Sequence, residues 1–169
     1  FGLRPESKPD IHEEIFQLIF HSKGGISFQD GYNMPIYLRR FYLQRLINYA
    51  ILGSGRQGIA AAYDLIKFGN PKKVYLYDIN LKSAIDGSEK LNNLIQSKTV
   101  LPGELDVSNH KSLVNCLKNI DVFISAVPYH LNPRITKAAL ESTSSMVDLG
   151  GHTDNVRQQL SYHKSAKEK

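Results

Sequence analysis

The stretch ILGSGRQGIA, residues 51–60, contains three glycines directly after a short apolar run. Gly53, Gly55 and Gly58 end that run and open an amphipathic segment. Three glycines at this spacing are weak evidence on their own, because glycine is common in turns. They can form a plain flexible turn or a loop that lets phosphate approach the backbone, and the elements on either side decide between the two.

Regular alternation of strand-like and helix-like segments begins near residue 46. Such alternation predicts a parallel sheet with right-handed crossovers and helices on both faces, and the mostly continuous apolar strands fit burial on both sides. Ser108 and Asn132 are expected to cap the helices that follow them. The expected strands are 48–53, 72–78, 99–107, 121–127 and 144–150, and the expected helices are 55–69, 81–97, 108–119, 133–142 and one that opens at Thr153 or Asp154.

The first 45 residues have a different character. Turn-forming sequences surround one clear helix candidate, which Asp10 can cap and in which apolar residues recur at helical spacing. We therefore expect an N-terminal segment of one helix plus loops, residues 1–45, and an α/β domain, residues 46–169. The basic aromatic stretch 37–45 is interpreted as an amphipathic segment that packs on the sheet or on another domain, in preference to a nucleic-acid site.

Bulk properties narrow the class of protein. The chain has 169 residues, a net charge of +5 and one cysteine, Cys116, so it cannot form an internal disulfide. It has no apolar run of the roughly 20 residues that a membrane helix needs, and no group of residues with zinc-ligand spacing. We expect a soluble cytoplasmic protein that binds neither nucleic acid nor membrane nor metal, with Cys116 as a small buried residue.

The context of the glycine loop meets the three conditions for a dinucleotide-binding fingerprint. The loop leaves a predicted strand, it opens a predicted helix, and an acidic residue ends the next strand about 20 residues further on. That residue is Asp78, twenty positions after Gly58. The sequence therefore predicts a Rossmann-type, doubly wound α/β fold, in preference to a glycine turn followed by an acid that only caps the next helix.

Each residue of the loop then has a physical task. Gly53 permits the tight turn, Gly55 lets the backbone approach a pyrophosphate, and Gly58 allows the helix to pack closely on the strand. The helix N-terminus offers unpaired N–H groups and a partial positive charge to the phosphates. The residues expected to hold the pyrophosphate are Gly53, Ser54, Gly55, Arg56, Gln57 and Gly58.

Asp78 and Ile79 are expected to hold the adenosine. A carboxylate at this position accepts hydrogen bonds from the ribose hydroxyls and repels a 2′-phosphate, so NAD is preferred. Arg56 and Lys82 are nearby cations that can tolerate a phosphate, so NADP stays possible.

The other strand ends complete the expected site, because ligands bind at the carboxyl ends of the strands in such sheets. Asp106 and Val107 suit the adenine edge, although Asp106 can instead only cap the next helix. The nicotinamide side is assigned to Ala126, Val127, Pro128 and Gly150, with a plain loop as the alternative at Gly150. His130 and His152 lie at the same edge, but histidines there are more often surface or hydrogen-bonding residues, so no catalytic residue is assigned.

Several motifs together resemble the nucleotide-binding half of the saccharopine dehydrogenase family. They are ILGSGRQGIAAAYDL, YDIN, LDV, SAVPYHLN and VDLGGHTDNVRQQL, and they extend over roughly residues 47–169. The chain is most similar to the lysine 6-dehydrogenase-like branch. Family members usually carry asparagine where this chain has His152.

The resemblance implies oxidation or reduction, with NAD(P), at a C–N bond of an amino acid such as lysine or a saccharopine-like adduct. In the family a second domain supplies most of the substrate pocket, and we expect that C-terminal catalytic domain to be absent from this chain. The chain alone is then expected to bind cofactor but to turn over poorly or not at all. A homo-oligomer is compatible with this interpretation. The alternatives are a non-catalytic NAD(H)-sensing regulatory domain and a synthase that condenses an amine with an aldehyde before reducing it.

Overall fold

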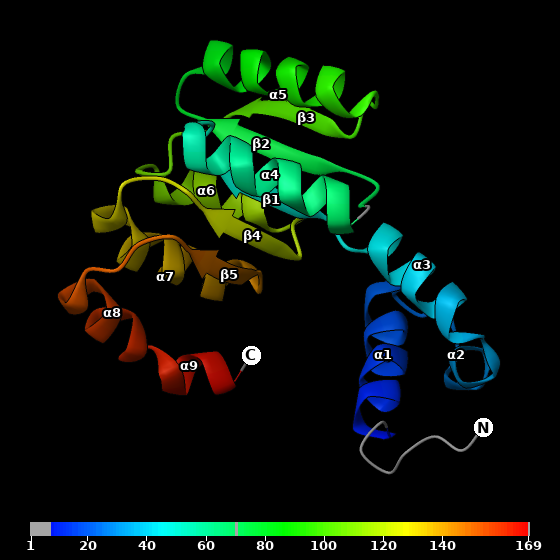
Figure 1. Ribbon diagram of the computed structural model, residues 1–169. Helices are drawn as coiled ribbons and strands as arrows, with labels where there is room; N and C mark the ends of the chain where they lie inside the picture. Colours follow the sequence, from blue (N-terminus) through cyan, green and yellow to red (C-terminus); the bar gives the residue numbers. More distant parts are fainter. Residues whose placement is uncertain (1–7, 70, 169) are drawn as a thin grey trace. The chain divides into compact units, whose positions relative to one another are not determined.

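The computed structural model of the protein describes residues 8–69 and 71–168. The chain forms two compact units, Phe1–Ile47 and Asn48–Lys169 (Figure 1). In the described ranges, no helix is both long enough and apolar enough to cross a membrane.

From residue 8 onward, the N-terminal unit contains three helices where the sequence predicted one. They are α1 (Lys8–His21), α2 (Phe28–Asn33) and α3 (Ile36–Leu46). The short helix α2 was missed because turn-forming residues dominate its sequence, yet Ser27 and Asp30 form a reciprocal capping box that stabilises its first turn. Helix α1 begins at Lys8, so Asp10, the predicted cap, lies within the helix.

A buried arginine connects these three helices. The side chain of Arg39 on α3 is 5% exposed, and its Nε donates to Glu14 on α1 at 3.3 Å. Its guanidinium also donates to the carbonyls of Met34 at 2.7 Å and Gly31 at 3.3 Å. Burying this cation requires several acceptors, and α1 and α2 supply two of them. The basic aromatic stretch 37–45, which was predicted to pack on the sheet or on another domain, lies in α3 and is connected through Arg39 to its own unit.

The second unit is built on a five-stranded, all-parallel sheet with strand order β3-β2-β1-β4-β5 (Figure 1). The predicted Rossmann-type α/β fold is confirmed. The strand β3 includes both Pro102 and Gly103. The Tyr77 side chain of β2 occupies the space where a Cβ of Gly103 would lie. The strands are β1 (Tyr49–Leu52), β2 (Val74–Asp78), β3 (Val100–Glu104), β4 (Val122–Ser125) and β5 (Ser145–Asp148).

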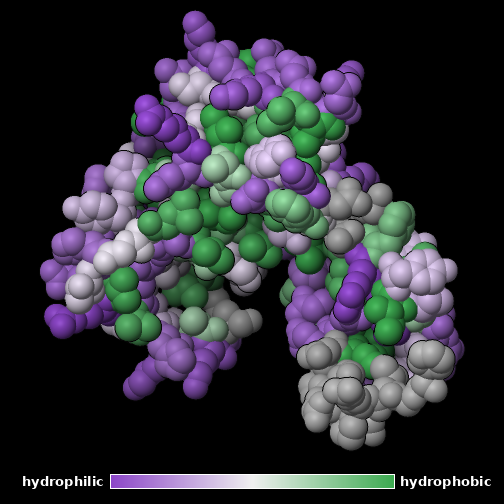
Figure 2. Space-filling view, viewed as in Figure 1, coloured by the Kyte–Doolittle hydropathy of each residue, from purple (hydrophilic) through white to green (hydrophobic). Residues whose placement is uncertain are grey.

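Helices cover both faces of this sheet. On one face α4 (Arg56–Gly69) and α5 (Leu81–Ile95) bury Ile51, Val74, Leu76, Ala62, Ile66 and Leu91. On the other, α6 (His110–Leu117) and α7 (Asn132–Ser142) bury Ala50, Leu52, Phe123, Leu113, Leu117 and Ile135. In Figure 2, hydrophilic residues cover much of the outer surface of α5, at the top of the view. The chain continues with α8 (Thr153–Leu160) and α9 (His163–Lys167).

Continuous burial holds for the central strand β1, where the last three residues are buried, but not for the edge strand β5, where Val147 is 56% exposed.

Two predicted helix caps in the second unit are wrong. Asn109, not Ser108, caps α6, because its side chain accepts from the Ser112 N–H at 3.1 Å. Asn132 lies inside the first turn of α7, where its Oδ1 accepts from the Ser125 hydroxyl at 2.8 Å. That internal bond takes the amide oxygen away from capping.

The packing of α4 on β1 predicts a sharp glycine requirement. A Cβ at Gly58 would overlap the carbonyl oxygen of Gly53, whereas a Cβ at Gly55 would have no atom within 4 Å. Gly58→Ala should therefore lower the free energy of unfolding by about 3 kcal/mol, and Gly55→Ala should change it by less than about 0.5 kcal/mol. Urea denaturation of both variants measures this, and equal stabilities would contradict the packing described.

Candidate functional site

A cavity of about 500 Å³ opens at the carboxyl ends of the strands in the second unit. Most predicted site residues line it, namely Gly53, Gly55, Asp78, Ile79, Asp106, Val107, Ala126, Val127 and Pro128. Predicted residues outside the lining are Ser54, Arg56, Gln57, Gly58 and Gly150. The sequence reasoning missed Tyr77, Leu105, Ser108 and Leu131, whose only sequence signal was their position beside predicted residues.

Gly53 holds three strand ends together. Its φ of +101° belongs to the left-handed region that favours glycine, and its N–H donates to the Tyr77 carbonyl at 2.7 Å. A Cβ here would come within 2.8 Å of the Ala126 carbonyl oxygen. The tips of β1, β2 and β4 therefore meet around a residue that cannot carry a side chain.

Beyond this turn the backbone opens toward the cavity. Gly55 lines the cavity with open space where its Cβ would be, and α4 begins at Arg56. The first amides of a helix have no acceptor within the helix, and the helix dipole gives this end a partial positive charge. The arrangement provides N–H groups for an anion and room for that anion to reach them.

Asp78 at the end of β2 is bonded to this loop. Its Oδ2 accepts from the Ser54 N–H at 2.8 Å and from the Ser54 hydroxyl at 2.7 Å, while its Oδ1 accepts from the Asn80 N–H at 3.0 Å. Partial burial alone would raise the pKa of Asp78, but hydrogen bonds from the backbones of Asn80 and Ser54, the Ser54 hydroxyl and the backbone of Ile79 outweigh it, so the pKa is lowered. The carboxylate is thus held charged at the cavity edge.

The segment after β3 forms the next part of the wall. Asp106 Oδ1 accepts from the Ser108 N–H at 2.8 Å, and Arg134 donates to the Ser108 carbonyl at 2.8 Å. Hydrogen bonds from Ser108, first from its side chain, lower the pKa of Asp106. Asp106 therefore shapes the turn before α6 and does not cap that helix, whose cap is Asn109.

The ring of Tyr77 gives the cavity an aromatic surface. It stacks on Tyr75 with ring centroids 6.1 Å apart and planes at 8°. Burial, followed by the hydrogen bond with Cys116, raises the pKa of Tyr77. Burial likewise raises the pKa of the half-buried Cys116 thiol, which lowers its reactivity at neutral pH.

The site residues predicted at the tips of β4 and β5 differ in whether they line the cavity. Ala126, Val127 and Pro128 line the cavity, whereas Gly150 packs under the turn that follows β4. A Cβ at Gly150 would come within 2.7 Å of the Asn132 side-chain nitrogen and 3.0 Å of the Tyr129 Cβ. Gly150 thus allows the two strand ends to pack closely.

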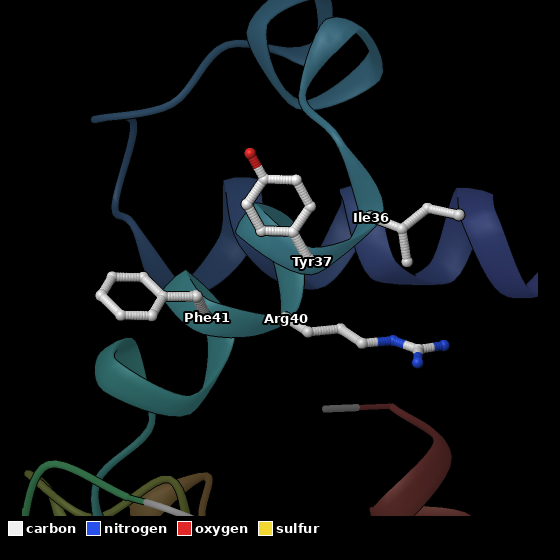
Figure 3. Close-up of a pocket in the computed structure, with 4 residues that line it drawn as sticks. All are labelled: Ile36, Tyr37, Arg40 and Phe41. Atoms are coloured by element: carbon white, nitrogen blue, oxygen red, sulfur yellow. The ribbon is translucent and has the colours of Figure 1, made fainter.

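A second hollow, of about 660 Å³, lies on α3 in the N-terminal unit (Figure 3). Ile36, Tyr37, Arg40 and Phe41 line it, and the Nε of Arg40 donates to Glu14 at 2.9 Å. None of these four side chains is a carboxylate or an imidazole. Across the residues that the structure describes, no three His, Cys, Asp or Glu side chains gather as a metal site. The strand-end cavity, where glycine backbone and the Asp78 carboxylate meet at the ends of the parallel strands, is the candidate site.

Comparison with known proteins identifies the family of the second unit. The saccharopine dehydrogenase NADP binding domain family matches residues 49–169. The apo saccharopine dehydrogenase (L-Glu forming) from Saccharomyces cerevisiae is similar over 66% of this chain and 23% of its own, with 25% identity and a TM-score of 0.53.

Two further solved structures share the fold. An NAD binding oxidoreductase from Klebsiella pneumoniae has 18% identity and a TM-score of 0.50, over 73% of this chain and 33% of its own. Leucoanthocyanidin reductase from Vitis vinifera, in a binary complex with NADPH, has 15% identity and a TM-score of 0.50, over 72% and 46%. The chain spans less than half the length of each of these three structures.

Fold and cavity together define an NAD(P)-binding domain of the dehydrogenase type. Within that class, the chain belongs to the saccharopine dehydrogenase NADP binding domain family.

The open space at Gly55 generates a binding prediction. Gly55→Val should fill the approach to the α4 N-terminus and weaken NADH binding at least about tenfold, or about 1.4 kcal/mol, with little change in melting temperature. Titration calorimetry with a parallel thermal melt measures both quantities. Unchanged affinity in a folded variant would place the phosphates elsewhere.

The lowered pKa of Asp78 generates a prediction about acid stability. Its ionised form stabilises the fold above the unfolded-state pKa of about 4, and this contribution is lost as the pH falls through the lower folded-state value. Asp78→Asn should therefore flatten the fall in melting temperature below about pH 4. The exposed Asp64→Asn serves as the matched control, and parallel acid profiles for the two variants and the wild type would refute the role given to Asp78.

Proposed function

We propose that the strand-end cavity binds NAD(H) with its pyrophosphate against the backbone of residues 53–58. Three features support this: the open space at Gly55, the α4 N-terminus behind it, and the charged Asp78 at the end of the neighbouring strand. The size of the cavity and its mixed glycine, apolar and carboxylate lining fit an extended dinucleotide. Ser54, Arg56, Gln57 and Gly58 support the loop from outside the cavity lining.

The adenosine then lies against Asp78, Ile79, Asp106 and Val107. The Asp78 carboxylate lies at the cavity edge, where it can accept a ribose hydroxyl, and Ile79 is 68% exposed beside it. The negative charge of Asp78 opposes a 2′-phosphate, which favours NAD(H) over NADP(H). The other end of the cofactor lies along Ala126, Val127 and Pro128, toward Gly150.

For the reaction, we propose hydride transfer at a C–N bond of an amino acid, with a lysine-like or saccharopine-like substrate. The family supports this substrate class. The cofactor supplies the hydride acceptor or donor when it is bound. In this proposal, the residues of the domain bind the phosphates and the ribose of the cofactor. They also set the direction in which the reactive end of the cofactor leaves the cavity. Membership of the lysine 6-dehydrogenase-like branch is part of the same proposal.

The rival is a domain that binds the dinucleotide only to report its level, because the same fold serves both purposes. Transfer of deuterium separates them. Lysine or saccharopine labelled at the carbon that bears the nitrogen is incubated with NAD⁺ and the protein purified from its natural source, because this chain alone is not expected to turn over, and the nucleotide is analysed by mass spectrometry. Deuterated NADH supports the dehydrogenase, whereas tight NAD(H) binding without label transfer from either compound favours the sensor.

Cofactor preference gives the most specific prediction. Asp78→Ala should weaken NADH binding by about 1–3 kcal/mol, because charged hydrogen bonds are lost, while NADPH should lose less since a repulsive charge is removed as well. Calorimetric titration of both nucleotides, with Asp64→Asn as control, measures the change in their ratio. An unaltered NADH affinity would remove Asp78 from the ribose site.

A further inference from the structure

A third cavity, of about 520 Å³, opens among the helices of the N-terminal unit. Its volume falls in the range of small-molecule sites, and the function proposed above does not use it. We call it the Arg39 cavity. Its lining includes Ile11 and His12 of α1, Tyr32 of α2, Met34 between α2 and α3, and Ile36 and Arg39 of α3.

Arg39 brings a buried cation to this cavity. Its side chain is 5% exposed, and a guanidinium has N–H donors on all three nitrogens and no acceptor. Nε donates to Glu14 at 3.3 Å, and Nη1 donates to the carbonyls of Met34 at 2.7 Å and Gly31 at 3.3 Å. The third nitrogen, Nη2, donates to none of the residues that the structure describes.

Nη2 of Arg39 faces open space and not packed protein. Among the side-chain nitrogen and oxygen atoms that the structure describes, only Ser88 Oγ is both fully buried and without a partner, so Nη2 reaches solvent. The open space that Arg39 lines is the Arg39 cavity. A charged donor in such a place needs an acceptor, and an oxyanion accepts from it more strongly than a neutral group does.

The local charge narrows the kind of anion. Glu14 Oε2 accepts from Arg39, and Glu14 Oε1 accepts from Arg40 at 2.9 Å, so one carboxylate serves two guanidinium groups and one positive charge stays unbalanced. The other carboxylates whose side chains are described in this unit, Glu13 and Asp30, accept hydrogen bonds elsewhere. A singly charged anion balances the remaining charge. A carboxylate therefore suits the cavity better than a phosphate dianion, which Glu14 would repel.

The rest of the lining is mainly apolar and partly open. Tyr32 is 57% exposed and Ile36 is 44% exposed, so a ligand can cover apolar surface that water now contacts. Removing that surface from water favours a ligand with an apolar body, and the Tyr32 ring can also stack on an aromatic one.

We propose that the Arg39 cavity binds a small monocarboxylate with an apolar or aromatic body. Its carboxylate accepts from Nη2 of Arg39, and its body lies against Tyr32 and Ile36. The same chemistry occurs in a free acid and at the C-terminus of a peptide that ends in an apolar residue. Because the cavity belongs to the N-terminal unit, this proposal does not depend on NAD(H) binding by the second unit.

The test titrates the isotope-labelled whole chain with 3-phenylpropionate and follows its backbone amide and arginine Nε–H NMR signals. The Arg39 Nε–H and the amides of residues 31–39 should shift. The acid should bind at least about tenfold more tightly than 3-phenylpropanol, which lacks the charge, and than acetate, which lacks the apolar body. N-acetylglycylphenylalanine represents the peptide source, and the tighter of the two acids identifies which source the cavity prefers.

Two results of this titration would overturn the proposal. The first is the absence of binding by both acids, or equal binding of 3-phenylpropionate and 3-phenylpropanol. The second is a set of shifts confined to residues 48–168, which would place the acid in the second unit.

A matched pair of variants gives a second readout. Tyr32→Ala should weaken 3-phenylpropionate about three- to tenfold, whereas Tyr37→Ala, which removes an exposed tyrosine of the same unit outside the cavity lining, should change it by less than about twofold. Both side chains are exposed, so neither change removes core packing. Arg39→Lys should abolish binding, but it also removes the bonds to Gly31 and Met34, so the tyrosine pair keeps the test decisive where that variant fails to fold. Equal losses for Tyr32→Ala and Tyr37→Ala would refute the placement of the ligand.

Discussion

The close contact between helix α4 and strand β1 is the constraint on which the rest of the second unit depends. The space beside Gly58 is taken by the carbonyl oxygen of Gly53, so only a glycine lets the helix start directly over the strand end. That approach brings the N-terminus of α4 next to Gly55, which lines the cavity and has open space where its Cβ would be. Hydrophobic burial on both faces of the sheet supplies most of the stability, but it does not by itself position this N-terminus.

A second link couples the loop to its neighbour strand. Ser54 donates twice to one oxygen of Asp78, so the residue assigned to the ribose also holds the loop assigned to the pyrophosphate. In the proposed arrangement, recognition of the ribose and recognition of the pyrophosphate are therefore not independent. A change of cofactor preference made at Asp78 alone would also release Ser54, and redesign of specificity would have to replace both side chains together.

The sequence predicted the α/β unit well because its elements follow strong local signals. The apolar runs, the glycine spacing and the position of Asp78 can each be recognised from a short stretch of sequence. The parallel sheet follows from the alternation of strand-like and helix-like segments. The failures required knowledge of side-chain contacts that the sequence pattern does not show. Asn132 was taken for a cap, but its amide turns inward to Ser125, and the helix α2 depends on a capping box inside a sequence that resembles a turn. The stacking of the Tyr129 and His152 rings joins two strand ends, which spacing along the chain does not reveal.

The central claim is that a diphosphate lies against the backbone amides of the first crossover. Backbone amide NMR during titration with inorganic pyrophosphate, then with NADH, tests it most directly. The account predicts that pyrophosphate shifts chiefly the amides of residues 53–59, and that NADH extends the shifts to the ends of β2, β3 and β4. Shifts confined to other surfaces, such as the hollow on α3 around Tyr37 and Phe41, would contradict it.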